Sequence, residues 1–187
     1  MSQIKLWLRL ACVLSVSLAG QAPAQDFGQG RNFVRIATLA NYINNDNRDE
    51  ETVSEIVAAT QNGRMLVYTD SPGEQIGFVF IGDPANPIPT GTLDMPGEPT
   101  AVAILGNNLA LVAVNTSDSY TDASGRLVVV RINQRDIVAE LELGGQPDSI
   151  AISPDNRFAA IAIENERNEE LCVGGTMSGA PVPEDGP

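Results

Sequence analysis

The sequence contains no histidine among its 187 residues and only two cysteines, and aromatic residues make up just 5% of it. Without histidine, these residues cannot form a Ser-His-Asp triad, a Cys-His dyad, a histidine-ligated zinc site or a c-type haem site. Any chemistry in this chain therefore relies on carboxylates, amides and hydroxyls.

Basic residues are also scarce, with 11 lysines and arginines against 24 acidic residues and a net charge of −13. This balance favours solubility and argues against binding to nucleic acid or to an anionic membrane, because both require a basic surface. Metal cations and cationic ligands remain open as partners. A plain solvated acidic surface is the simpler explanation of the charge.

The N-terminus has the pattern of an export signal. Lys5 and Arg9 precede an apolar run over residues 10–18, and Ala-Pro-Ala follows at 22–24. This pattern predicts a signal peptide over residues 1–24 and a secreted or periplasmic protein. The run is too short for a transmembrane anchor, which needs about 20 residues. Cleavage would leave nine basic and 24 acidic residues, a net charge of −15.

Cys172 would then be the one remaining cysteine in an oxidising compartment. Cysteines in such compartments normally pair, so we expect a disulfide partner outside this chain segment. That partner would lie beyond Pro187 or on another chain. A free thiol is the alternative.

A strand-rich unit recurs along the chain. Similar stretches begin at Ser54, Thr100 and Asp148, at spacings of 46 and 48 residues, and Gly-Glu-Pro or Gly-Gln-Pro precedes the second and third. A period of about 40–50 residues with four short strands in each unit is typical of propeller blades. We therefore predict an all-β fold, a partial β-propeller with two full four-stranded blades, the start of a third and an N-terminal closing strand.

The predicted boundaries follow alternating apolar residues and turn residues. After the signal peptide, residues 25–53 hold an N-terminal strand and an acidic connector. Blades follow at 54–99 and 100–147, with a partial blade at 148–164 and an acidic Gly/Pro-rich loop or tail at 165–187. The expected strands are 55–59, 65–69, 77–81 and 90–95 in the first blade, 100–105, 109–114, 126–132 and 137–143 in the second, and 149–152 and 158–163 in the third.

The lone strand predicted at residues 33–39 stands where a fourth blade strand would precede the first unit. Propellers commonly close by adding such an N-terminal strand to the final blade, so that no sheet edge stays open. The alternative is an ordinary strand added to the first blade. A ring needs at least about four blades, so we expect further C-terminal blades in a longer chain, or a partner chain that completes the ring.

Residues 144–161 resemble the YVTN-repeat propeller family, whose blades share a Gly-Gly-x-Pro turn, an apolar strand, Ser-Pro-Asp-Gly and a second strand. Here Asn156 replaces the usual glycine, and asparagine tolerates the same left-handed turn conformation. More narrowly, residues 67–73, 97–100, 114–117 and 162–167 resemble the N-terminal propeller of secreted bacterial choice-of-anchor I or phytase-like esterase proteins, which also occur alongside alkaline phosphatases. The resemblance implies a secreted propeller of roughly seven blades, in which any catalytic activity rests on parts outside these residues.

Superposing the units places Asp70, Asn115 and Glu164 at one position, the end of the second strand, and so on one rim. Glu98, Gln146 and Asp148 are expected beside them, and Glu166 lies close in sequence. Calcium and magnesium prefer carboxylate and amide oxygens as ligands. The leading site hypothesis is therefore a ligand site formed by Asp70, Asn115, Glu164 and Glu166, with a metal ion at Asp70 and Glu164. The alternative is that such residues cap strand ends and bond turn backbone.

The sequence therefore predicts a binding or scaffold module of a larger exported protein. The alternative is part of a metal-dependent hydrolase of phosphoric or other esters, whose catalytic residues lie mostly outside this chain. A third possibility, an inactive remnant, follows only if this incomplete ring of blades cannot fold by itself.

Overall fold

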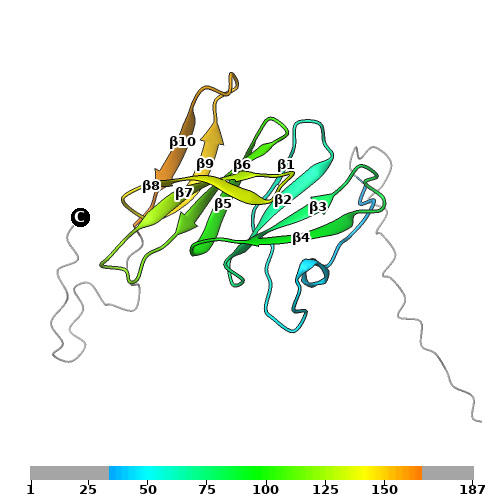
Figure 1. Cartoon of the computed structure of the whole chain (residues 1–187), viewed down its shortest axis with the longest axis horizontal. Helices are drawn as coiled ribbons and strands as arrows, with labels where there is room; N and C mark the ends of the chain where they lie inside the picture. Colours follow the sequence, from blue (N-terminus) through cyan, green and yellow to red (C-terminus); the bar gives the residue numbers. More distant parts are fainter. Residues whose placement is uncertain (1–33, 166–187) are drawn as a thin grey trace, which may run out of the picture. The chain divides into compact units, whose positions relative to one another are not determined.

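The computed structural model describes residues 34–165. The chain divides into two units, Met1–Arg35 and Ile36–Pro187. Within the described residues of the second unit, one short 3-10 helix, η1 (Asn41–Asn44), comes first, and all later regular elements are strands (Figure 1). The predicted signal peptide, Glu166 and Cys172 lie outside the described residues.

The described strands form three antiparallel sheets, each built from consecutive strands in chain order. This arrangement confirms the predicted all-β class and the succession of blades. The first sheet contains β1 (Val57–Ala59), β2 (Met65–Asp70), β3 (Gln75–Phe80) and β4 (Ile88–Asp94); the second contains β5 (Glu98–Leu105), β6 (Leu109–Asn115), β7 (Gly125–Arg131) and β8 (Asp136–Glu142); the third contains β9 (Pro147–Ile152) and β10 (Ala159–Ile163).

Turn residues set the strand ends much as their chemistry predicts. Gly63, in the turn between β1 and β2, has φ +66°, and Asn156, between β9 and β10, has φ +58°. Both lie in the left-handed region, which glycine adopts freely and asparagine tolerates. The replacement of glycine by Asn156 therefore preserves the hairpin, as predicted.

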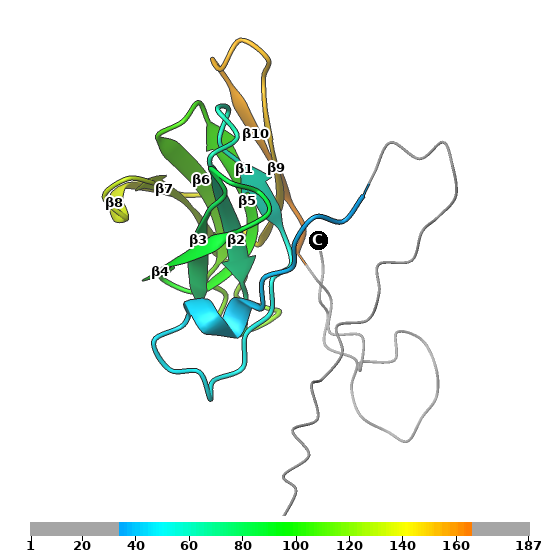
Figure 2. The same cartoon turned by 90° about the vertical axis from the view of Figure 1, so that its right-hand side faces the viewer.

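The second and third sheets each pack their first strand against the preceding sheet. β5 contacts β1, β2 and β3, and β9 contacts β5 and β6. Figure 2 shows β5 beside β1 and β2. The interior between the first two sheets is apolar, and its fully buried side chains include Ile76 and Phe78 of β3 and Val128 and Val130 of β7.

The predicted strand at residues 33–39 does not form a strand in the described part of that range, since residues 34–40 have no regular secondary structure. The physical reason is that a strand needs a hydrogen-bonded neighbour, and the described residues pair none with this segment. Val34 and Ile36 are accordingly exposed, at 76% and 65%. Its role as a closing strand stays a prediction.

Candidate functional site

The three residues predicted to share a rim occupy equivalent strand ends. Asp70 ends β2, Asn115 ends β6 and Glu164 directly follows β10. The turn before each unit's first strand lies beside them, as expected for Glu98 and Gln146. Glu98 pairs with Asn115 in the ladder of β5 and β6, and the backbone N–H of Glu164 donates to the carbonyl of Gln146 at 2.8 Å.

Asp70 is fully buried and its carboxylate is engaged by the chain itself. Its Oδ1 accepts from the backbone N–H of Val53 at 2.9 Å. Its Oδ2 accepts from the Thr52 hydroxyl at 2.5 Å and from the Gln75 amide at 2.9 Å. Asp70 therefore fastens the connector of residues 45–53 to the end of β2, the strand-end role that the sequence left open as the alternative.

The Asp70 carboxylate also acts on its neighbour Tyr68. Burial raises the pKa of the Tyr68 hydroxyl, and the negative charge of Asp70 raises it further, while the hydrogen bond from Asn44 works in the opposite direction. Tyr68 therefore keeps its proton well into alkaline conditions, because the anion would lose hydration and face a like charge.

The other two rim residues are more accessible. Asn115 is half-buried, and its Oδ1 accepts from the backbone N–H of Ser117 at 3.0 Å. This contact is an Asx turn, which shapes the loop after β6. The side-chain nitrogen of Asn115 takes no part in that hydrogen bond. Glu164 and Glu98 are exposed. The structure therefore separates one buried fastening residue from exposed polar groups at the same rim.

These residues do not by themselves form a cation cage. Calcium takes six to eight oxygen ligands, yet both Asp70 oxygens already accept hydrogen bonds. Within residues 34–165, no group of three or more acidic, cysteine or histidine side chains is placed to hold a metal ion. A calcium or magnesium ion would thus need ligands from elsewhere, and the metal at Asp70 and Glu164 stays a prediction.

Asn44, which sequence reasoning missed, ends η1, directly before the connector, and its side chain is engaged in several hydrogen bonds. Its amide group donates to the Tyr68 hydroxyl at 3.0 Å and to the carbonyls of Phe78 and Gly91 at 3.2 and 3.1 Å, and its Oδ1 accepts from the Gly91 N–H at 2.7 Å. The ladder between β3 and β4 shifts register beside Phe78. Asn44 thus satisfies backbone groups that a bulge leaves unpaired.

Glycine residues mark this place in the sequence. Gly91, inside β4, has φ +102°, and Gly77, inside β3, lies under the Tyr68 ring where a Cβ would clash. A glycine inside a strand signals a bulge or a close approach. The two glycines therefore locate the irregular part of the sheet in the sequence. They do not reveal that Asn44, 47 residues before Gly91, hydrogen-bonds the backbone there.

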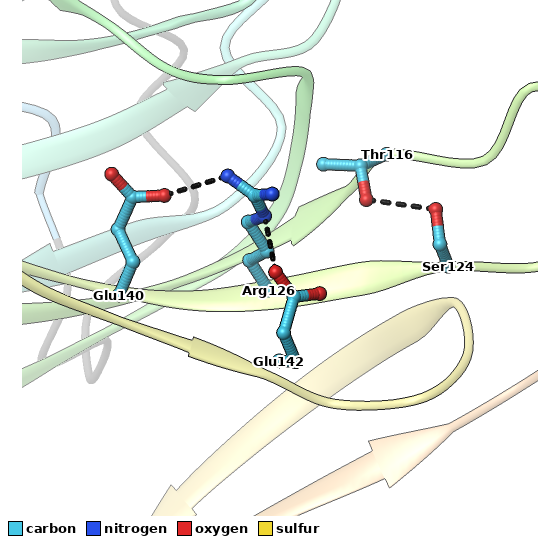
Figure 3. A network of polar contacts seen from close by, with 5 residues as sticks. All are labelled: Thr116, Ser124, Arg126, Glu140 and Glu142. Carbon is cyan, nitrogen blue, oxygen red and sulfur yellow. Dashed lines mark hydrogen bonds and ion pairs between the residues drawn. The ribbon is translucent and has the colours of Figure 1, made fainter.

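A second polar network lies on the outer strands of the second sheet (Figure 3). Arg126 pairs with Glu140 at 2.9 Å and with Glu142 at 3.0 Å, and nearby the Thr116 and Ser124 hydroxyls share a 2.9 Å hydrogen bond. The Arg126 and Glu140 side chains are 38% and 39% exposed. Ion pairs this accessible contribute at most about 1 kcal/mol, so the network is a surface feature of the sheet.

No helix in the described part of the chain is long and apolar enough to cross a membrane.

Several solved structures are similar to part of this chain. Hydrazine synthase of Kuenenia stuttgartiensis matches with a TM-score of 0.51 and 17% identity over 59% of this chain and 30% of that chain. A functionally unknown protein from Desulfotomaculum acetoxidans DSM 771 matches with a TM-score of 0.46 and 13% identity over 57% and 31%. A luciferin-regenerating enzyme matches with a TM-score of 0.43 and 16% identity over 56% and 34%.

The chain spans about a third of the length of these structures. At such low identity, the likeness to hydrazine synthase shows the fold alone, which is that of a propeller-containing protein. No curated protein matches the sequence.

A family model supplies the more specific result. The model of the choice-of-anchor I domain matches residues 55–180, a range that includes all three sheets. Choice-of-anchor domains occur in exported bacterial proteins. The sequence resemblance noted at the strand ends agrees with this match, and the chain belongs to the choice-of-anchor I family.

Proposed function

We propose that this chain is a secreted or periplasmic propeller module that binds a ligand or partner as part of a larger exported protein, and that it has no catalytic activity of its own. The observation that carries the proposal is the repetition of strand ends at one rim, where the turn before each unit lies beside Asn115 or Glu164. Propellers commonly use such loop-bearing faces for binding. The absence of histidine favours binding over catalysis.

The rim residues have different roles in this proposal. Asp70 holds the connector in place, since its oxygens already bond Thr52, Val53 and Gln75. Exposed Glu164 and half-buried Asn115 are the ligand contacts. Glu166 follows Glu164 closely in the sequence and adds a third. Because the chain is strongly acidic, the ligand class that fits is a metal cation or a cationic group.

A calcium titration tests this function. Thermal unfolding of the purified chain is recorded with and without calcium, in the parent, in Glu164→Gln and in the control Asp155→Asn, whose exposed carboxylate lies in the turn at the other end of β9 and β10. Binding at a calcium concentration 100 times the Kd stabilises by about 2.7 kcal/mol. We expect the parent and control to gain stability and Glu164→Gln to lose the gain.

Two results would contradict the proposal. An equal response in the parent and Glu164→Gln, or no response in any of them, would show that this rim does not bind calcium. Metal-dependent hydrolysis of p-nitrophenyl phosphate by the purified chain would instead support the alternative of an ester hydrolase.

A further inference from the structure

Hydrogen bonds join three turns at the strand ends opposite to the rim of Asp70. The backbone N–H of Asn62, between β1 and β2, donates to the side-chain oxygen of Asn107, between β5 and β6, at 2.7 Å. The backbone N–H of Ile132, directly after β7, donates to the carbonyl of Asn108 at 2.8 Å. The turns β1–β2, β5–β6 and β7–β8 are therefore held together where the first two sheets meet.

These turns contain no acidic residue, although the chain has 24. Residues 60–64, 106–108 and 132–135 read Thr-Gln-Asn-Gly-Arg, Gly-Asn-Asn and Ile-Asn-Gln-Arg. Their polar side chains are amides, one hydroxyl and two arginines, Arg64 and Arg135, both exposed. An anion can approach such a group of hydrogen-bond donors without meeting the repulsion that the rest of this acidic chain exerts.

Both arginines are held over phenylalanine rings of β3. The Arg64 guanidinium lies over the Phe80 ring at 5.5 Å from its centroid, and the Arg135 guanidinium lies over the Phe78 ring at 5.6 Å. Phe78 belongs to the core between the first two sheets, and Phe80, two residues on, shares its face of the strand. The two cations therefore reach one face of β3 from two different sheets.

Gly91 leaves room for Arg135. A Cβ at this position of β4 would lie 3.2 Å from Nη1 of Arg135, and φ +102° favours glycine here. The Arg135 guanidinium thus lies close to the β4 backbone as well as to the Phe78 ring. These two contacts restrict its position at the interface of the sheets.

Neither arginine has a carboxylate partner among residues 34–165, whereas Arg126 and Arg131 do. Two acids at the same end of the strands are engaged elsewhere. Asp136 pairs with Arg131 at 3.1 Å, and Asp83 accepts from the Asn86 amide at 2.7 Å. A guanidinium that lies over a ring keeps the N–H donors along its edge, and their spacing matches the paired oxygens of an oxyanion.

We propose that Arg64 and Arg135 form a binding site for a tetrahedral dianion, a phosphate or sulfate group. A tetrahedral group presents four oxygens and can meet two guanidinium groups at once, whereas the two oxygens of one carboxylate match a single guanidinium. The side-chain nitrogens of Asn62 and Asn107 take no part in the hydrogen bonds that join the turns, and they add neutral donors. This site does not rest on the proposed function, because it lies at the other strand ends and takes an anion.

Isothermal titration of the purified chain with inorganic phosphate tests the site, in calcium-free buffer held at constant ionic strength with chloride. The parent is compared with Arg64→Gln, with Arg135→Gln and with the control Arg157→Gln. Arg157 is a close match, since its guanidinium lies over the ring of Phe158 at 5.6 Å, in the exposed turn between β9 and β10. We expect one phosphate per chain, parent affinity in the control, and at least about tenfold weaker binding in the other two variants.

Circular dichroism checks that the variants fold. If Arg135→Gln loses the parent spectrum, Arg135→Lys takes its place, because lysine keeps the charge and loses the planar fork; it too should bind phosphate more weakly. Sulfate should compete with phosphate for the site.

Four results would overturn the inference. They are no saturable binding beyond that of chloride, no competition by sulfate, equal weakening in Arg157→Gln, and two phosphates per chain with one retained at parent affinity in each single variant. The third would reduce the effect to net charge, and the fourth would show that the arginines act separately. Glu164→Gln should bind phosphate like the parent, so failure of this site and failure of the calcium site are seen separately.

Discussion

Replacing Asn44 with alanine should strongly destabilise the protein. The side chain is 5% exposed, and its amide bonds Tyr68, Phe78 and Gly91. Alanine leaves the N–H of Gly91 without this acceptor, and a buried unsatisfied group costs about 1–3 kcal/mol. The Phe78 carbonyl keeps a hydrogen bond from Thr90 at 3.0 Å, which limits the loss there.

Taken together, the lost bonds should lower the free energy of unfolding by about 3 kcal/mol, a large part of the 5–15 kcal/mol of a typical domain. With an m value of about 1.5 kcal/mol per molar urea, the urea midpoint should fall by about 2 M. Circular dichroism across a urea series measures it. Limited proteolysis near residues 46–50, which are exposed, should also accelerate as the connector loosens.

Asn45→Ala is the matched control, because Asn45 is also buried, at 7% exposed. Among residues 34–165, its Oδ1 has no hydrogen-bond partner. Removing an unsatisfied group should leave stability within about 1 kcal/mol of the parent or raise it. If Asn44→Ala costs less than about 1 kcal/mol, or Asn45→Ala costs as much as Asn44→Ala, the account of Asn44 is refuted.

Three further predictions concern single side chains. The folded-state pKa of Tyr68 lies above its ordinary value of 10.0, so the stability it contributes is present below pH 10 and is lost as the pH rises through the folded pKa. Tyr68→Phe should therefore flatten the alkaline fall in urea midpoints between pH 9 and 11, and an unchanged slope would contradict this. Gly77→Ala should cost about 1–3 kcal/mol in urea unfolding because the new Cβ meets the Tyr68 ring, and a neutral result would contradict that packing. Hydrogen bonds from the Ser153 hydroxyl and the Arg157 N–H lower the pKa of Asp155. The stability that Asp155 contributes is therefore present above its unfolded pKa and is lost as the pH falls through its folded pKa. Thermal melts from pH 6 to 2 should show a weaker acid dependence in Asp155→Asn than in the parent, and identical profiles would contradict this.

The strands were predictable from the sequence because their signals are local. Alternating apolar residues and turn residues such as Gly63 and Asn156 placed the strands of each blade, with shifts of a few residues at their ends. The predicted strand at residues 33–39 failed within the described residues for a non-local reason. Its apolar pattern is present, but strand formation requires a partner, and none of the described strands pairs with it.

The rim was predictable in position but not in chemistry. Repetition correctly placed Asp70, Asn115 and Glu164 at equivalent strand ends. Whether a carboxylate there is free or engaged depends on residues of the connector, and Thr52 and Val53 have no counterpart in the repeat pattern that would reveal their bonds to Asp70. Asn44 was missed for the same reason, since it lies in a polar stretch and acts across 47 residues.

The central claim is that this propeller module belongs to a larger exported assembly. Native and denaturing intact-mass measurements on the protein purified from the exported fraction of its source, without reduction, test it most directly. The account predicts a denatured mass above the 19.8 kDa of these residues, from a longer chain. A single species at or below 19.8 kDa under both conditions would contradict it.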